Sequence, residues 1–170
     1  MKEFLVNLST QRRYWAVLIL IGAALEGGAL YYQYVLDEWP CVLCIHVRIW
    51  VVAFMLLAMV AIFCTNSIVA TRIAHFLNVG FMVGLLERSW RVLAVERGWI
   101  FGDCDMDLGM PTWFALDKWF PSLFEVQTAC GYTPLIIFDI TMAESLVVIS
   151  ALMLIISAAV FVASWFDLSK

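Results

Sequence analysis

Four long apolar stretches limit the folds open to this chain more than any other feature. They run over residues of about 14–36, 45–63, 68–93 and 143–166. A helix needs about 20 apolar residues to cross the hydrocarbon core of a bilayer. The 170 residues are 64% hydrophobic and only 14% charged, which is too apolar for a soluble domain of this size. We therefore expect an all-α membrane protein, a four-transmembrane-helix bundle that forms one integral membrane domain over residues 1–170, with membrane lipid around it.

Charged residues outside the apolar stretches set the orientation of this bundle. Four spans put both termini on one side, where five of the ten basic residues gather: Lys2, Arg12, Arg13, Arg72 and Lys170. The long loop over about 94–142 is acidic, with Asp103, Asp105, Asp107, Asp117, Glu125 and Asp139 against only Arg97 and Lys118. Basic residues favour the cytoplasmic side, so we expect cytoplasmic termini and exterior loops at about 37–44 and 94–142. Arg88, Arg91 and Arg97 near the outer end of the third span oppose this assignment, but the N-terminal charges support it.

A short amphipathic segment lies within the second, longer exterior loop. From Trp113 to Phe120, apolar residues recur at i, i+3 and i+6 or i+7, which is a helical spacing. The segment is too short and too charged to span a bilayer. We expect a short interfacial helix that lies on the membrane; the alternative is a helix that packs on its own loop.

A Cys-x-x-Cys pair, Cys41 and Cys44, stands where the second span begins. Pro40 precedes it and favours a turn or an extended entry into the helix. The partial positive charge of a helix N-terminus favours a thiolate. Arg48 follows Cys44 by one helical turn on the same face. A cation at this depth needs a partner, and a thiolate, a carbonyl oxygen or a carboxylate could serve.

Two further cysteines, Cys104 and Cys130, fall in the long exterior loop, so four thiols share a compartment that permits disulfides. Cys64 lies near the opposite end of the second span, and we expect it to be a buried or cytoplasmic thiol without a chemical role. One interpretation is a pair of purely structural disulfides, but a Cys41–Cys44 bridge closes too small a loop to add much stability. A zinc site usually needs two tight Cys pairs, so we expect no metal.

The remaining interpretation is a relay between two dithiols. Electrons that reach Cys44 need an acceptor at the membrane boundary, and a lipid-soluble quinone is the natural one. The sequence has no glycine-rich dinucleotide motif. Among the other polar residues of the apolar stretches, two have more than one possible role. Glu26 is either functional or a protonated carboxyl packed against another helix, and His46 is either a proton donor to the reduced quinone or an interfacial side chain.

These residues resemble the DsbB family, bacterial inner-membrane enzymes that make disulfides and pass the electrons to quinone. The resemblance covers almost the whole chain. Its motifs are the Cys-x-Leu-Cys-x-x-x-Arg start of the second span, Ala24-Leu25-Glu26 in the first span, and Leu-Asp-Lys-Trp-x-Pro over residues 116–121. One departure is Val47, which is apolar where the family is often polar or acidic, and another is the titratable His46.

The resemblance implies a site and partners. Cys41–Cys44 and Cys104–Cys130 would be the redox disulfides, and a periplasmic DsbA-like thioredoxin-fold protein would attack Cys104. Cys41 would exchange with Cys130, and Cys44 would face ubiquinone or menaquinone. Arg48 would steady the quinone or the Cys44 thiolate, and Met142 would line the same pocket. The cysteines would face the periplasm, and no nucleic acid would be involved.

Two alternatives stay open at this point. A vitamin-K-epoxide-reductase-like enzyme has the same chemistry, but there we would expect the Cys-x-x-Cys near the last span. A non-catalytic, disulfide-bonded membrane adaptor would tolerate replacement of Cys41 and Cys44, and it leaves Arg48 unexplained. A conduit for reductant across the membrane would need a thiol pair deep in the bilayer, which Cys64 alone cannot supply.

Overall fold

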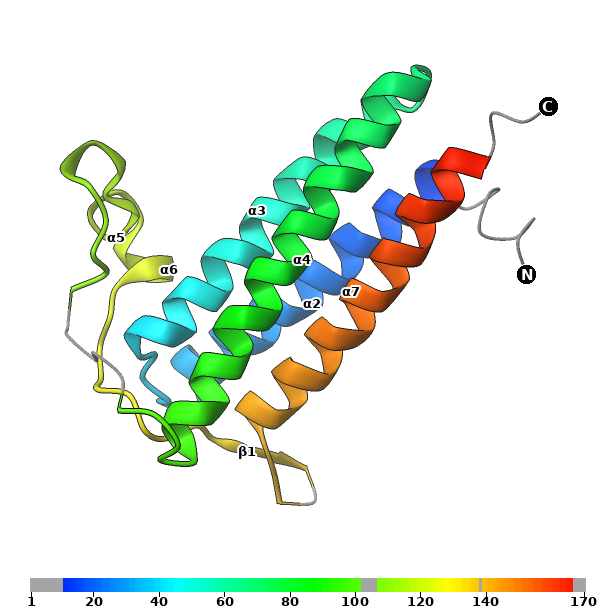
Figure 1. The fold of residues 1–170 in the computed structure, drawn as a ribbon. Coiled ribbons are helices and arrows are strands. Elements are labelled where there is room, and N and C mark those ends of the chain that lie inside the picture. Colours follow the sequence, from blue (N-terminus) through cyan, green and yellow to red (C-terminus); the bar gives the residue numbers. More distant parts are fainter. Residues whose placement is uncertain (1–10, 102–106, 138, 167–170) are drawn as a thin grey trace.

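The structure, a computed structural model, describes residues 11–101, 107–137 and 139–166. Four long helices dominate it: α2 (Arg12–Val35), α3 (Val42–Cys64), α4 (Ile68–Glu96) and α7 (Met142–Phe166). Each is long and apolar enough to cross a membrane. They pack as a bundle in which α3 contacts α2 and α4, and α4 contacts α7 (Figure 1). The predicted fold class, an all-α bundle of four membrane helices, is confirmed.

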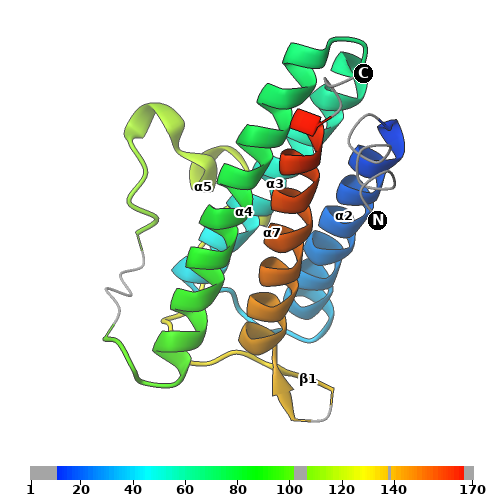
Figure 2. The same ribbon diagram turned by 45° about the vertical axis from the view of Figure 1, so that its right-hand side comes forward.

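The ends of the helices define two faces of the molecule. The first residues of α2 and the last residues of α7 lie at one end of the bundle, and the β hairpin lies at the other (Figures 1 and 2). The turn between α3 and α4 is short, and the Ser67 side chain caps α4 by accepting a hydrogen bond from Ala70 N. The start of α3, with the Cys-x-x-Cys pair, is at the hairpin end.

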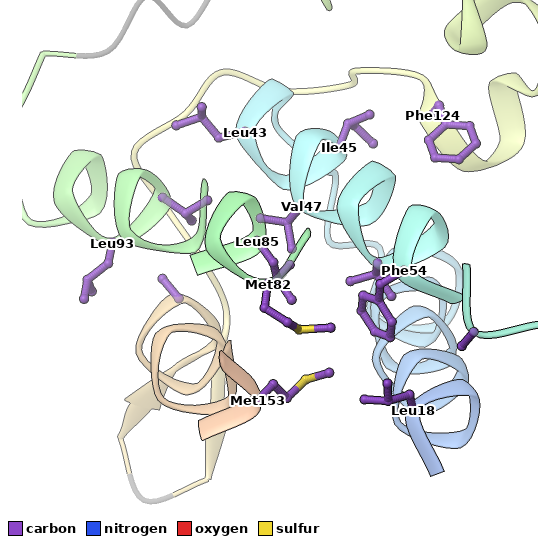
Figure 3. Close-up of a cluster of buried hydrophobic side chains, with 14 of the residues drawn as sticks. Leu18, Leu43, Ile45, Val47, Phe54, Met82, Leu85, Leu93, Phe124 and Met153 are labelled. Carbon is purple, nitrogen blue, oxygen red and sulfur yellow. The ribbon is translucent and has the colours of Figure 1, made fainter. Parts of the chain in front are cut away.

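The core of the bundle is made of large apolar side chains that meet between the helices. Met82 of α4 and Met153 of α7 extend toward Phe54 and Leu18 (Figure 3). α3 and α4 approach closely at Gly84, where a Cβ would lie 2.7 Å from the Trp50 ring. Small residues permit such contacts between membrane helices, which have little hydrophobic drive to associate.

A polar cluster ties α2, α4 and α7 together near the terminal end. Asn78 donates hydrogen bonds to Tyr14 Oη at 3.1 Å and to Ser157 Oγ at 3.0 Å, and the Tyr14 hydroxyl lies 3.2 Å from Ser157 Oγ. His75 stacks on Trp15 with ring centroids 4.8 Å apart. His75 is therefore a packed core residue.

The long loop runs beside α3 and returns to the hairpin end. It contains η1 (Thr112–Phe114), α5 (Leu116–Trp119), α6 (Pro121–Phe124), β1 (Leu135–Ile137) and β2 (Ile140–Thr141). The segment expected to form a short interfacial helix is thus divided into turns. Pro121 explains the break, because it disfavours helical geometry at Phe120, which has φ −135° and ψ 65°.

Aromatic side chains of this loop segment face both α3 and the surroundings. Phe124 is buried against α3 near Ile45 (Figure 3), and an apolar groove between loop and helix extends to Leu56. Trp113 and Trp119 are exposed. Exposed tryptophans beside an apolar helix face suit the membrane interface.

Candidate functional site

The two thiols of the Cys-x-x-Cys pair meet at the start of α3. Cys41 is the N-cap residue, with an extended backbone after Pro40, and its sulfur accepts a hydrogen bond from Cys44 N at 3.3 Å. The Sγ atoms of Cys41 and Cys44 lie 2.6 Å apart, and the two residues are thiols in this structure. The two sulfurs must therefore approach by only about 0.5 Å to form a disulfide bond.

A third cysteine is brought to this pair by the long loop. Gln127 N and Thr128 N donate to Pro40 O at 3.0 and 3.3 Å, and Thr128 forms a parallel bridge with Cys41. Cys130 follows two residues later and contacts the Cys41 thiol through a side-chain hydrogen bond. The structure thus brings together Cys41, Cys44 and Cys130. Cys104 lies outside the described residues.

The environment of Cys41 favours its protonated form. The hydrogen bond with Cys130 lowers the pKa of Cys41, but the hydrogen bond with Cys44 and burial raise it, and the net pKa is about 12. Only 3% of the residue is exposed. Cys41 is therefore the member of the pair that keeps its proton at neutral pH and can donate it toward Cys44.

Arg48 is buried one turn deeper, and its partners are neutral. Nη1 donates to Gln33 Oε1 at 2.6 Å and to Leu123 O at 3.0 Å, and Nη2 donates to Ala29 O at 3.2 Å. Of the partners that sequence reasoning allowed for this cation, the structure has carbonyl oxygens. The described residues contain no carboxylate paired with Arg48, so its positive charge is oriented but not neutralised. The Nε hydrogen and one Nη2 hydrogen remain for a ligand.

Gln33 is the residue that sequence reasoning missed. It is buried, and besides accepting from Arg48 it donates from Nε2 to Gln127 Oε1 at 3.2 Å. It therefore links the cation to the loop segment that carries Cys130. A signal was available: Gln33 is a polar residue in an apolar span, and it follows Glu26 by two helical turns on the same face.

A cavity of about 280 Å³ lies between α2, α3 and α7 beside these groups. Cys44 and Arg48 line it from α3, Glu26 from α2 and Met142 from the start of α7. Most of the remaining wall is apolar, and Val47, the departure from the usual family pattern, belongs to that wall. Gly28 also lines the cavity, and a Cβ there would meet no atom within 4 Å.

Two other predicted residues lie away from this cavity. His46 is not in its lining; one ring nitrogen, Nε2, lies 3.2 Å from Leu108 O in the loop. Its other nitrogen, Nδ1, is buried and has no hydrogen-bond partner among the described residues. Cys64 is the last residue of α3, at the end of the helix opposite Cys41.

This donor set suits a quinone. An apolar cavity accepts a flat ring and a lipid-like tail, the unused hydrogens of Arg48 can hold a carbonyl oxygen, and Cys44 offers a thiol at the same wall. The cavity opens among helices that are apolar enough to lie in a membrane, where a lipid-soluble ligand is dissolved. The fold and the site together define a class: multi-pass membrane proteins with a dithiol beside an apolar cavity.

Comparison with known proteins gives the family. The DsbB family, described as "Disulfide bond formation protein DsbB", matches residues 11–160, and the chain belongs to this family. The chain is similar to disulfide bond formation protein B of Photorhabdus laumondii, with 29% identity over 98% of this chain and 99% of the relative. It is also similar to the protein of that name from Shewanella denitrificans, with 30% identity over 82% of this chain and 81% of the relative. Disulfide bond formation protein B 2 of Pseudomonas aeruginosa is 30% identical over 71% of this chain and 72% of the relative.

Family membership confirms the resemblance noted in the sequence. The protein is a disulfide bond formation oxidoreductase, and it is a multi-pass membrane protein with four candidate spans.

Proposed function

We propose that this protein reoxidises a periplasmic, DsbA-like thioredoxin-fold dithiol and passes the electrons through two cysteine pairs to a membrane quinone. One observation carries the proposal: the Cys41–Cys44 pair faces two ways. Cys41 contacts Cys130 in the exterior loop, and Cys44 lines the apolar cavity with Arg48. A dithiol that only stabilised the fold would need neither neighbour.

The relay is a series of thiol–disulfide exchanges that starts from oxidised protein. A partner thiolate attacks Cys104 in a Cys104–Cys130 disulfide, and Cys130 leaves as a thiolate. Cys130 attacks Cys41 in the Cys41–Cys44 disulfide, and Cys44 leaves as a thiolate. The partner's second thiol resolves its bond to Cys104, and Cys104 then resolves the Cys41–Cys130 bond. The partner ends as a disulfide, and Cys41 and Cys44 hold the two electrons.

Cys44, Arg48 and Met142 would hold the quinone in the cavity. The quinone, ubiquinone or menaquinone, supplies an acceptor for two electrons and two protons. Arg48 stabilises negative charge at the cavity wall, on either the Cys44 thiolate or an acceptor oxygen. His46 lies outside the cavity lining, so a direct role in quinone binding has no support from its position.

The proposed setting is a single membrane domain over residues 1–170 in the bacterial inner membrane. The termini would be cytoplasmic. Basic residues favour the cytoplasmic side, and the end of the bundle where α2 begins carries Arg12, Arg13 and Arg72. The end with Cys41 and Cys130 would then face the periplasm, which permits disulfides.

A coupled assay tests the proposal. Purified protein is mixed without oxygen with a reduced thioredoxin-fold oxidant and a soluble quinone, and both quinone absorbance and partner thiols are followed. We expect quinone reduction matched to thiol oxidation, lost in Cys44→Ser and kept in Cys64→Ser. Thiol oxidation without quinone consumption would contradict the acceptor. Failure with every partner tried would favour a non-catalytic adaptor with structural disulfides.

A further inference from the structure

We propose that Glu26 is the proton donor of the cavity: it holds a proton on its carboxyl group inside the membrane and gives it up when Cys44 gives up electrons. This inference rests on the proposed function, because it assigns a role in the reduction of a quinone. It concerns a residue whose role sequence reasoning left open between a functional acid and a packed carboxyl.

The position of Glu26 carries the argument. Its side chain lines the same cavity as Cys44 and Arg48. It also shares a face of α2 with Ala29 and Gln33, which follow it by three and seven residues and accept hydrogen bonds from Arg48. Because α2 runs toward the hairpin end, Glu26 is the deepest of the three. Cys44, Arg48 and Glu26 therefore mark the cavity from its outer end inward.

Among the described residues, no cation or hydrogen-bond donor pairs directly with the Glu26 carboxyl group to hold it as an anion. Glu26 Oε1 is buried and accepts no hydrogen bond among the described residues. Arg48 is near enough to interact with it electrostatically, but the guanidinium donates its described hydrogen bonds to Gln33, Leu123 and Ala29. An ionised carboxylate in an apolar, membrane-embedded site is costly without direct pairing, so the neutral acid is the favoured form.

The other groups around Glu26 cannot replace it as donor. The titratable or charged residues that share the cavity are Tyr32 of α2 and Cys44 and Arg48 of α3. The lining residues of α4 and α7 carry no titratable group: Val92, Met142, Ser145, Leu146 and Ile149. A guanidinium does not act as a proton donor at ordinary pH, Cys44 is the electron donor, and a phenol is in general a weaker acid than a carboxylic acid. Within the part of the chain that the structure describes, Glu26 is thus the one carboxylic acid that lines the cavity.

The proton balance leaves one proton to be supplied from a source other than the dithiol. When Cys41 and Cys44 close to a disulfide, the Cys44 thiolate and the Cys41 thiol together lose two electrons and the Cys41 proton. The acceptor takes up two electrons and two protons, so one proton is missing. Glu26 supplies it and becomes a carboxylate for the rest of the cycle. It recovers a proton from water when the reduced product leaves and the cavity is open.

Two substitutions at Glu26 test this role. Glu26→Gln keeps the shape but has no proton to give, and Glu26→Asp keeps the acid on a shorter side chain. We expect Glu26→Gln to slow quinone reduction by about 100-fold or more, in the range typical of a lost general acid. Glu26→Asp should restore part of the rate. Glu87→Gln is the matched control, because Glu87 is an exposed acid that pairs with Arg88 and Arg91 outside the cavity.

Two readouts separate a proton donor from a packing residue. Infrared spectroscopy of the quinone-free protein at neutral pH should show a protonated carboxyl band that is lost in Glu26→Gln and kept in Glu87→Gln. The wild-type rate of quinone reduction should fall as the pH rises and the Glu26 carboxyl group loses its proton. This decline should be absent in Glu26→Gln. Disulfide exchange with the partner, measured without quinone, should be unchanged in both Glu26→Gln and Glu87→Gln.

The outcomes distinguish this inference from the function on which it rests. If wild type reduces quinone and Glu26→Gln does so equally fast, Glu26 is only a packed carboxyl and the inference fails alone. An absent carboxyl band in wild type would also overturn it, because Glu26 would then be ionised. If wild type oxidises the partner but reduces no quinone, the proposed acceptor fails and this inference fails with it.

Discussion

Arg48 is a buried cation whose described partners are all neutral, and this arrangement keeps its charge available. Three oxygens, from Gln33, Ala29 and Leu123, fix the guanidinium without cancelling its charge. Only 6% of the residue is exposed, so solvent screens that charge little. A preorganised positive charge at a low-dielectric wall is the arrangement that stabilises a developing anion most effectively.

Gln33 should act as a positioning residue for Arg48. Gln33→Leu removes the 2.6 Å bond to Nη1 and leaves a buried donor unsatisfied. We expect the free energy of unfolding to fall by about 1–3 kcal/mol and the KM for quinone to rise, while disulfide exchange with the partner stays unchanged. Steady-state kinetics at varied quinone and thermal unfolding in detergent measure these effects.

Gln127→Ala is the control for that prediction. It removes only the bond between Gln33 Nε2 and Gln127 and leaves Arg48 with all its described partners. Its effect on the KM for quinone should be smaller. Equal effects from the two substitutions would mean that the loop contact, rather than the bond to Arg48, sets quinone affinity.

The raised pKa of Cys41 predicts a specific pH dependence. With a pKa of about 12, Cys41 is a thiol at neutral pH and reacts slowly with alkylating agents. In reduced protein, its alkylation should accelerate as pH rises from 8 toward the alkaline range. The folded state holds this proton more tightly than the unfolded chain, whose thiols have a pKa of about 8.5. The stability that this contributes is therefore present below pH of about 8.5 and is lost as pH rises toward 12.

Mass spectrometry of alkylated peptides checks the prediction about Cys41. Unfolded protein at the same pH provides the reference rate for an ordinary cysteine. Rapid labelling of Cys41 at neutral pH in the folded, reduced protein would contradict the assigned protonation. If the alkylation rate of Cys41 does not change with pH, the slow labelling is due to burial alone.

At the scale of elements, the apolar stretches determined which helices form, but not how they are rotated against one another. Apolar length and the Pro40 entry placed Cys41 and Cys44 at a helix start. The contact of Gln33 with Arg48 depends on the facing angle of α2 and α3, which side-chain packing decides. The proximity of Cys130 to Cys41 depends on loop pairing at Pro40, for which the sequence has no local signal.

Gly28 of α2 offers a way to fill the cavity without disturbing the bundle. Gly28 lines the cavity and has room for a side chain, since a Cβ there meets nothing within 4 Å. Gly28→Leu should fold with a thermal stability near that of wild type and should weaken quinone binding by about tenfold or more, which corresponds to about 1.4 kcal/mol. Titration of a quinone analogue measures the affinity directly.

Gly80 of α4 is the matched control for Gly28. A Cβ at Gly80 also meets nothing within 4 Å, and Gly80 does not line the cavity. Gly80→Leu should leave the affinity unchanged. Equal affinities in wild type and Gly28→Leu would show that the ligand binds elsewhere.

The molecule has Cys41, Cys44 and Cys130 at one end. The first residues of α2 and the last residues of α7 lie at the other end. Hydropathy and charge predicted this polarity, because an even number of spans and the positive-inside rule suffice for it. The four-helix bundle and the family followed from the same sequence. The division of the loop segment at Pro121 and the placement of His46 against Leu108 are details that only the structure supplies.

The orientation predicts opposite accessibility for Cys64 and Cys130. In intact cells stripped of their outer membrane, a membrane-impermeant thiol reagent should label reduced Cys130 from outside but not Cys64. Variants that retain one of the two cysteines separate the signals, and lysed cells give the total reactivity. Labelling of Cys64 from outside would show that the proposed orientation is wrong, because Cys64 ends α3 at the face opposite Cys41.

The central claim is that the Cys41–Cys44 dithiol passes its electrons directly to a quinone in the adjoining cavity. The most direct measurement uses fully reduced protein in which Cys104 and Cys130 are both replaced by Ser, mixed anaerobically with quinone and without any partner. Our account predicts a rapid burst of one quinone reduced per protein, accompanied by a Cys41–Cys44 disulfide in the mass spectrum, and no burst in Cys44→Ser. A Cys104/Cys130 double variant that keeps Cys41 and Cys44 reduced in excess quinone would contradict the account.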